Sequence, residues 1–151
     1  MEGLRDLYQE VILDHNKNPR NFHKLETANH KAEGRNPLCG DHYTVYVQVE
    51  NDKVVDIAFE GSGCAISKAS ASIMSQELKG KSITEVDYLF RLFQKVVTGE
   101  TDAMEHLEEL GKLAAFAGVA EFPVRVKCAI LSWHALNGAL HEDRSTISTE
   151  E

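Results

Sequence analysis

The sequence predicts an α+β domain in which a small antiparallel β-sheet of two to three strands is covered by about five to six helices. Two observations lead to this fold class. Apolar residues recur with helical spacing at the start of the chain and through its second half, and between these regions they alternate with polar residues. At 151 residues with 42% hydrophobic content, the chain can bury one substantial core.

The first predicted element is an amphipathic helix that stops before Pro19, because the residue preceding a proline is disfavoured in the α region. Its apolar residues are Leu4, Leu7, Tyr8, Val11 and Ile12. A polar connection then runs from Arg20 to about Pro37.

A β-hairpin is predicted next. Alternation places Tyr43, Val45, Val47 and Val49 on one face of the first strand, and Val55, Ile57 and Phe59 on one face of the second. The Asn51-Asp52 pair between them suits a tight turn, because both residue types tolerate positive φ. One face of the sheet is therefore expected to be buried.

Helices follow the hairpin. One begins at Cys64 and closes at Gly80, and a second runs from a capping box of Ser82 and Glu85 to Val97. A third pattern covers Met104 to Phe116, and the last helix runs from about Pro123 or Val124 to His141. The predicted core stripe of the last helix is Val124, Cys128, Leu131, Ala135, Leu136 and Ala139.

The chain is read as one domain over residues 1–141, followed by a polar tail over 142–151 that we expect to be disordered. The net charge of −8 argues against nucleic-acid binding, and no stretch is long enough to cross a membrane. Three cysteines cannot all pair in disulfides, and no signal peptide opens the chain, so we expect a cytoplasmic protein with reduced thiols.

The three cysteines and one aspartate form a candidate metal-ligand set. Cys39 and Asp41 lie two residues apart and can face one ion, while Cys64 begins a helix, where free N–H groups favour a thiolate. Three thiolates and a carboxylate match a tetrahedral zinc site. From its local pattern alone, Cys128 fits a core position as well as a ligand position.

Four anionic ligands around a divalent cation leave a surplus negative charge, so cations are expected nearby. Arg125 and Lys127 are the candidates, and Arg125 shares a helix face with Cys128 three residues later. The histidines are not taken as ligands: His42 and His134 are expected in surface or supporting positions, and His15 at a helix stop.

Several segments resemble the U-type iron–sulfur assembly proteins over nearly the whole chain up to about His141. These segments are Asp14-His15 with Asn18-Pro19-Arg20-Asn21, Asn36-Pro37-Leu38-Cys39-Gly40-Asp41, Gly61-Ser62-Gly63-Cys64-Ala65-Ile66-Ser67, and Pro123-Val124-Arg125-Val126-Lys127-Cys128. Within that family, the IscU branch usually has a histidine where this chain has Lys127. The extra residues between Val97 and Pro123 resemble the insertion of the SufU branch.

The resemblance implies a SufE/IscU-like fold and a zinc ion, Zn2+, held by Cys39, Asp41, Cys64 and Cys128. It also implies sulfurtransferase activity, in which Cys39 accepts persulfide sulfur from a pyridoxal-phosphate cysteine desulfurase of the SufS type. The sulfur would pass to a downstream iron–sulfur assembly scaffold. Arg125 is assigned to orienting Cys39 or Asp41 and to offsetting the negative charge of the site.

Two other functions fit the same residues. The four ligands could hold a transient [2Fe–2S] cluster, as in an IscU-type scaffold, since thiolates bind both iron and zinc. Alternatively, the metal could serve only the fold of a structural zinc-binding interaction domain. An aspartate ligand and a cysteine on a loop argue for a labile site over a structural one.

Overall fold

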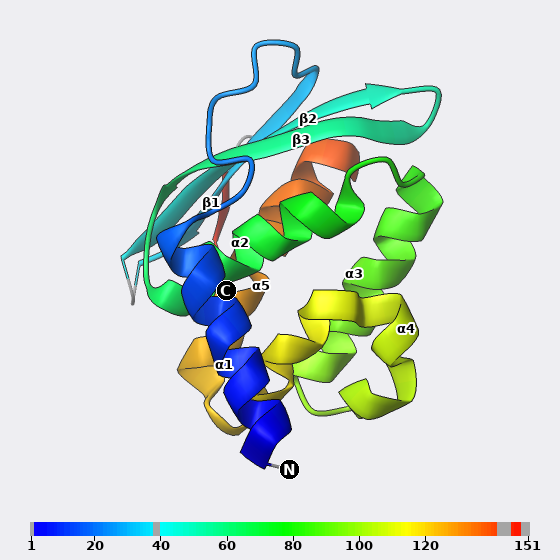
Figure 1. Ribbon diagram of the computed structural model, residues 1–151. Helices are drawn as coiled ribbons and strands as arrows, with labels where there is room; N and C mark the ends of the chain where they lie inside the picture. Colours follow the sequence, from blue (N-terminus) through cyan, green and yellow to red (C-terminus); the bar gives the residue numbers. More distant parts are fainter. Residues whose placement is uncertain (1, 38–39, 142–145, 149–151) are drawn as a thin grey trace.

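The computed structural model describes residues 2–37, 40–141 and 146–148, in which helices gather on one side of a four-stranded sheet (Figure 1). The strands are β1 (His30–Asn36), β2 (Asp41–Glu50), β3 (Lys53–Ser62) and β4 (Thr146–Ser148). The α-helices are α1 (Glu2–Lys17), α2 (Ala65–Leu78), α3 (Ile83–Val97), α4 (Leu107–Leu110) and α5 (Pro123–His141), with 3-10 helices η1 (Ala103–His106) and η2 (Gly111–Glu121). The predicted α+β fold class is confirmed.

The sheet has the strand order β3-β2-β1-β4, with β1, β2 and β3 antiparallel to one another. The predicted hairpin is β2–β3, and its turn residues Asn51 and Asp52 have φ of 52° and 60°. Such a turn matches the twist of the flanking strands, which is why asparagine and aspartate are favoured there. The turn fixes the register that brings the start of β2 beside the end of β3.

The predicted alternation on β3 is wrong at its first position. Val54 is fully buried, whereas Val55 is exposed. The register changes from Gln48 paired with Asp56 to Val49 paired with Val54, so β3 contains one extra residue at this point. A β-bulge of this kind moves the alternation by one residue and turns Val55 outward.

Strand β1 lies in the segment that the sequence predicts as a polar connection. Its inward positions are Ala32, Gly34 and Asn36, which give no apolar alternation for a strand prediction. Gly34 faces α5 closely: a Cβ there would lie 3.1 Å from Leu131 Cδ1. The small inward residues of β1 therefore let α5 approach the sheet.

The predicted disordered tail contains a short strand, which corrects that expectation for three of its residues. Thr146–Ser148 form β4 and pair in parallel with Glu33–Arg35 of β1. The unpaired backbone groups at the edge of β1 account for this pairing, and three residues are too few to give a periodic signal in the sequence.

Helices α2 and α5 pack directly on the sheet and on each other, and α1 packs on α2. The predicted capping box of α3 is present, with Ser82 Oγ accepting the Glu85 N–H and the Glu85 carboxylate accepting the Ser82 N–H. Gly80, with φ of 89°, follows the end of α2 as predicted. These helices surround a core that contains the inward residues of β2 and β3.

Two helical predictions need correction. The continuous helix over Met104–Phe116 is divided into η1, α4 and η2, because Gly111 ends α4 with φ of 54°. Val124 does not belong to the core stripe of α5, since it is 57% exposed. The other predicted stripe residues, which are Cys128, Leu131, Ala135, Leu136 and Ala139, are all buried.

A buried histidine ties α1 to α2. His15 is fully buried, and its Nδ1 lies 2.7 Å from Ser72 Oγ, which also accepts the N–H of Arg20. Its Nε2 has no hydrogen-bond partner among the described residues. Burial, aided by the positive charge of Arg20, lowers the pKa of His15 to about 4. This histidine is therefore neutral in the folded protein at neutral pH. The helices in the described part of the chain include none that is long and apolar enough to cross a membrane.

This histidine predicts a specific loss of stability in acid. The unfolded chain protonates His15 near its ordinary pKa of 6.5, while the folded protein resists protonation down to about 4. The free energy of unfolding therefore has its full value well above pH 6.5, where His15 is neutral in both states. It decreases by about 3 kcal/mol as the pH drops to 4. Urea unfolding of the metal-free protein across this range measures the decrease.

The His15→Gln variant should be less stable at neutral pH but should lose this part of the pH dependence. His23→Gln, at an exposed histidine, is the matched control and should keep the wild-type slope. Equal slopes in the two variants would contradict the assignment.

Candidate metal centre

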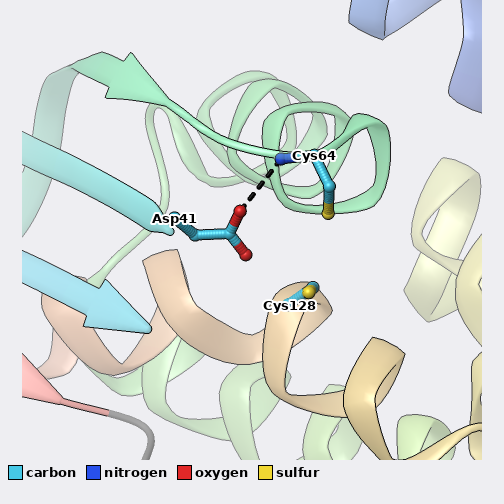
Figure 2. A group of neighbouring side chains, drawn as sticks. All are labelled: Asp41, Cys64 and Cys128. Carbon is cyan, nitrogen blue, oxygen red and sulfur yellow. Dashed lines mark hydrogen bonds between the residues drawn. The ribbon is translucent and has the colours of Figure 1, made fainter. Parts of the chain in front are cut away.

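Three predicted ligands from three different elements converge on one space (Figure 2). Asp41 begins β2, Cys64 precedes α2, and Cys128 lies in the second turn of α5. Their ligand atoms, a carboxylate oxygen and two sulfurs, lie within 4.8 Å of one another. The fourth predicted ligand, Cys39, lies outside the described residues.

Sheet pairing explains why residues so distant in sequence meet. His42 pairs with Ser62, so the start of β2 lies beside the end of β3, from which the chain passes through Gly63 to Cys64. Helix α5 packs on β1 and β2 and places Cys128 opposite this corner. The centre therefore depends on the hairpin register and on the docking of α5.

Asp41 is a buried carboxylate with a hydrogen-bond partner on only one of its two oxygens among the described residues. Its residue exposure is 2%, and its Oδ1 accepts the backbone N–H of Cys64 at 2.9 Å. Its Oδ2 is buried and has no hydrogen-bond partner among the described residues. A buried carboxylate oxygen without a partner is expected to bind a cation or a donor.

Cys64 is the N-cap of α2, and its Sγ accepts the backbone N–H of Ser67 at 3.4 Å. The Ser67 hydroxyl in turn lies 2.9 Å from the hydroxyl of buried Tyr43 and donates to the carbonyl of Cys64. The sequence alone predicts no role in the metal centre for Ser67 or Tyr43. In the sequence, Ser67 can be recognised by its N-cap spacing, three residues after Cys64. Tyr43 can be recognised by its position two residues after Asp41, on the same strand face.

The two thiols differ in protonation. A hydrogen bond from Cys128, and further bonds from Ser67, lower the pKa of Cys64 to about 6. The same interaction with Cys64, together with burial and the Asp41 carboxylate, raises the pKa of Cys128. Cys64 is exposed and Cys128 is 3% exposed, which agrees with this order. These opposite pKa shifts favour the thiolate on Cys64 and the proton on Cys128 in the metal-free protein.

Gly63 provides the space in which the Asp41 carboxylate lies. A Cβ at this position would be 2.5 Å from Asp41 Oδ1, 2.6 Å from Ser67 Oγ and 2.7 Å from the Tyr43 hydroxyl oxygen. Real Cβ atoms do not approach neighbours so closely, so any other residue would displace the carboxylate. In the sequence, Gly63 stands out only as part of the segment from Gly61 to Ser67 that resembles the U-type proteins.

The other predicted residues lie around this cluster. Arg125 is exposed, with its guanidinium 4.4 Å from the centre of the Phe122 ring, and Lys127 is half-buried. His42 Nε2 lies 3.3 Å from a carboxylate oxygen of Glu33, and the His134 ring packs edge-on against Phe90. Neither histidine is among the clustered ligands in the described part of the chain.

The donor set fits zinc. Two sulfurs and one carboxylate oxygen are donors that zinc accepts in tetrahedral sites, and the free Oδ2 of Asp41 supplies an oxygen that is otherwise uncompensated. Asp41, Cys64 and Cys128 would hold such an ion. The cluster, in which Asp41 and Cys128 are buried and Cys64 is exposed, is a candidate metal centre of the thiolate class on a small α+β domain.

Comparison with known proteins identifies the family. Residues 7–129 match the model of the NifU-like N terminal domain. The chain is 42% identical over 134 residues to the zinc-dependent sulfurtransferase SufU of Bacillus subtilis, covering 89% of each chain. It is 40% identical to the iron–sulfur cluster assembly scaffold protein IscU of Streptococcus pyogenes, covering 93% of this chain and 86% of the relative.

A solved structure is similar as well. A candidate iron–sulfur cluster assembly scaffold protein for the SUF system of Fervidobacterium islandicum superposes with a TM-score of 0.80 and 38% identity, over 87% of this chain and 94% of that one. The chain therefore belongs to the family of NifU-like N-terminal domains, together with the IscU- and SufU-type proteins of iron–sulfur cluster assembly.

The close approach at Gly63 predicts that Gly63→Ala weakens metal binding. The new methyl group must push the Asp41 carboxylate from its position, and such losses of ligand support typically cost about 10- to 100-fold in metal affinity. Competition with a chromophoric zinc chelator measures the change. Gly118→Ala, where an added Cβ meets nothing within 4 Å, is the control and should bind as wild type.

The two thiols should be chemically distinguishable once the metal is removed. Iodoacetamide should alkylate Cys64 first, with a rate that rises through about pH 6, because the thiolate is the reactive form. Peptide mass spectrometry across pH 5 to 8 locates that midpoint.

Removing the hydrogen bond from Cys128 tests the cause of the low pKa. In Cys128→Ala the alkylation midpoint of Cys64 should move up toward its ordinary pKa of 9.0. An unchanged midpoint would show that Cys128 does not lower the pKa of Cys64.

Proposed function

We propose that the protein is a zinc-dependent sulfur acceptor that takes persulfide sulfur from a SufS-like cysteine desulfurase for iron–sulfur cluster assembly. The observation that carries this proposal is the convergence of Asp41, Cys64 and Cys128 around an uncompensated carboxylate oxygen. The likeness to a zinc-dependent sulfurtransferase across most of both chains supports it.

Cys39 is proposed as the fourth ligand and as the acceptor. Two Cα–Cα steps of about 3.8 Å separate it from Asp41, so covalent geometry keeps it near the cluster. Bound zinc would hold the cysteine ligands as thiolates at neutral pH. Cys64 begins a helix and Cys128 is buried in one, whereas Cys39 lies in the chain between two strands. Cys39 is therefore the ligand whose release disturbs the fold least.

The transfer step is a thiol–persulfide exchange. The Cys39 thiolate attacks the terminal sulfur of the persulfide on the desulfurase, and a new S–S bond forms on Cys39. The S–S bond in the desulfurase breaks, and its cysteine leaves as a thiolate. No net oxidation occurs, because one persulfide is exchanged for another. The persulfide would then pass to a downstream assembly scaffold.

Arg125 keeps its proposed role of offsetting the negative charge near Cys39 and Asp41. It lies three residues before Cys128 on the same helix, so its long side chain belongs to the turn that borders the cluster. To act there, its guanidinium must leave the Phe122 ring, an exchange that costs only about 0.5–1 kcal/mol at an exposed site.

A second candidate function is supported by the likeness to an IscU scaffold protein. The same sulfur donors could receive iron and sulfide and hold a transient [2Fe–2S] cluster. Lys127 stands where the IscU branch usually has a histidine, which favours the zinc-dependent transfer role. A structural zinc domain is the third possibility, and its cysteines would be needed for the fold itself.

Desulfurase turnover on cysteine tests the proposal. The zinc-loaded protein should accelerate sulfide release and gain one sulfur atom on Cys39, detected by mass spectrometry. Cys39→Ser should keep most of the thermal stability yet lose stimulation and labelling. A large loss of stability would favour the structural zinc domain. A stable cluster spectrum after anaerobic reconstitution with iron and sulfide, without stimulation of the desulfurase, would favour the scaffold.

A further inference from the structure

Asn36, the last residue of β1, is a buried polar residue without a partner. Its exposure is 0%, and neither its Oδ1 nor its Nδ2 has a hydrogen-bond partner among the described residues. Leaving such groups unsatisfied costs about 1–3 kcal/mol each, so an apolar residue would suit an ordinary core position better. A buried side-chain amide of this kind calls for a partner that arrives with a ligand.

The strand register places Asn36 directly opposite Asp41. The two residues form the last pair of the antiparallel β1–β2 ladder, and both side chains are buried on the same face. Opposite residues have Cβ atoms about 5 Å apart. Their polar atoms without hydrogen-bond partners among the described residues are complementary, because Asn36 Nδ2 is a donor and Asp41 Oδ2 is an acceptor.

The packing of α5 places Asn36 beside the rest of the cluster as well. Along β1, His30 Nδ1 contacts the carbonyl of Ala139, and Gly34 faces Leu131 and Ala135. The strand thus runs antiparallel to α5, and its end at Asn36 approaches the turn that carries Cys128. Asn36 therefore lies beside two of the clustered residues, with Asp41 opposite it in the strand register and the turn of Cys128 near it through the packing of α5 on β1.

We propose that Asn36 is a positioning residue of the metal centre, whose side-chain amide donates to Oδ2 of Asp41 when the metal is bound. The carboxylate would then be held at both oxygens, by the Cys64 N–H at Oδ1 and by Asn36 at Oδ2. Each carboxylate oxygen has two lone pairs, so Oδ2 can accept this hydrogen bond and still ligate. This inference rests on the proposed function, since it requires a metal at the cluster.

Asn36 variants should lose metal affinity out of proportion to their loss of stability. Asn36→Ala removes the amide, and Asn36→Asp keeps its volume while replacing the donor by a second carboxylate. Both variants should bind zinc about 10- to 100-fold more weakly than wild type, and Asn36→Asp should bind it more weakly than Asn36→Ala. Chelator competition gives the affinities, and thermal unfolding of the metal-free proteins gives the stabilities.

Cobalt substitution supplies a readout that is independent of activity. The visible bands of bound Co2+ report the donor set and its geometry, so the Asn36 variants should show shifted bands when loaded. Ser75→Ala is the matched control: Ser75 is also a buried polar residue, but it lies 11 positions after Cys64, or roughly 16 Å along α2. Ser75→Ala should lower stability and leave zinc affinity and the cobalt spectrum unchanged.

The outcomes distinguish a failure of the inference about Asn36 from a failure of the proposed function. If wild type and Ser75→Ala bind zinc and stimulate the desulfurase while both Asn36 variants bind as wild type, Asn36 only ends the strand and the inference is overturned. If Asn36→Asp does not fold, Asn36→Ala decides alone. If wild type itself binds no zinc, the proposed function fails, and with it the premise for Asn36.

Discussion

The burial of the Asp41 carboxylate is the constraint to which the rest of the site is adapted. An ionised carboxylate removed from water costs several kcal/mol unless hydrogen bonds or a cation replace its hydration. The fold supplies one replacement, the N–H of Cys64, and the absence of a side chain at Gly63 makes that contact possible. The second oxygen is left for a ligand. The energetic cost of burying Asp41 is thus the physical reason to expect a cation at this cluster.

The two described cysteines of the cluster differ in protonation because their surroundings differ. Cys64 lies exposed at a helix N-terminus, where the Ser67 N–H and the helix dipole stabilise a negative charge. Cys128 lies buried and keeps its proton while Cys64 is ionised. A metal that takes both sulfurs must displace this one remaining proton, so metal binding and proton release are coupled at Cys128. Of the two described thiols, only Cys128 must therefore give up a proton when a metal binds at neutral pH.

The structure brings Asp41, Cys64 and Cys128 together. The sequence singles out these three residues because each belongs to a local pattern: a glycine-flanked loop, a helix start, and a position on an amphipathic helix. It failed where packing decided the outcome. Strand β1 was missed because its inward residues are small or polar, a composition that only makes sense once α5 lies against Gly34. The exposed Val55 was misplaced because a bulge has no signature in the alternation that it interrupts. The burial of Asn36 could not be predicted for the same reason as β1, because a buried polar residue is recognised only by its neighbours in the fold.

The short link between β1 and β2 limits where sulfur transfer can occur. Its ends are fixed, because Asn36 pairs with Asp41 in the sheet and both residues are buried. A sulfur acceptor at Cys39 is two residues from Asp41, and an extended chain spans at most about 3.6 Å per residue. Its Cα can thus lie no more than about 7 Å from that of Asp41. Under the proposed transfer, a desulfurase would therefore have to bring its persulfide within reach of the cluster of Asp41, Cys64 and Cys128.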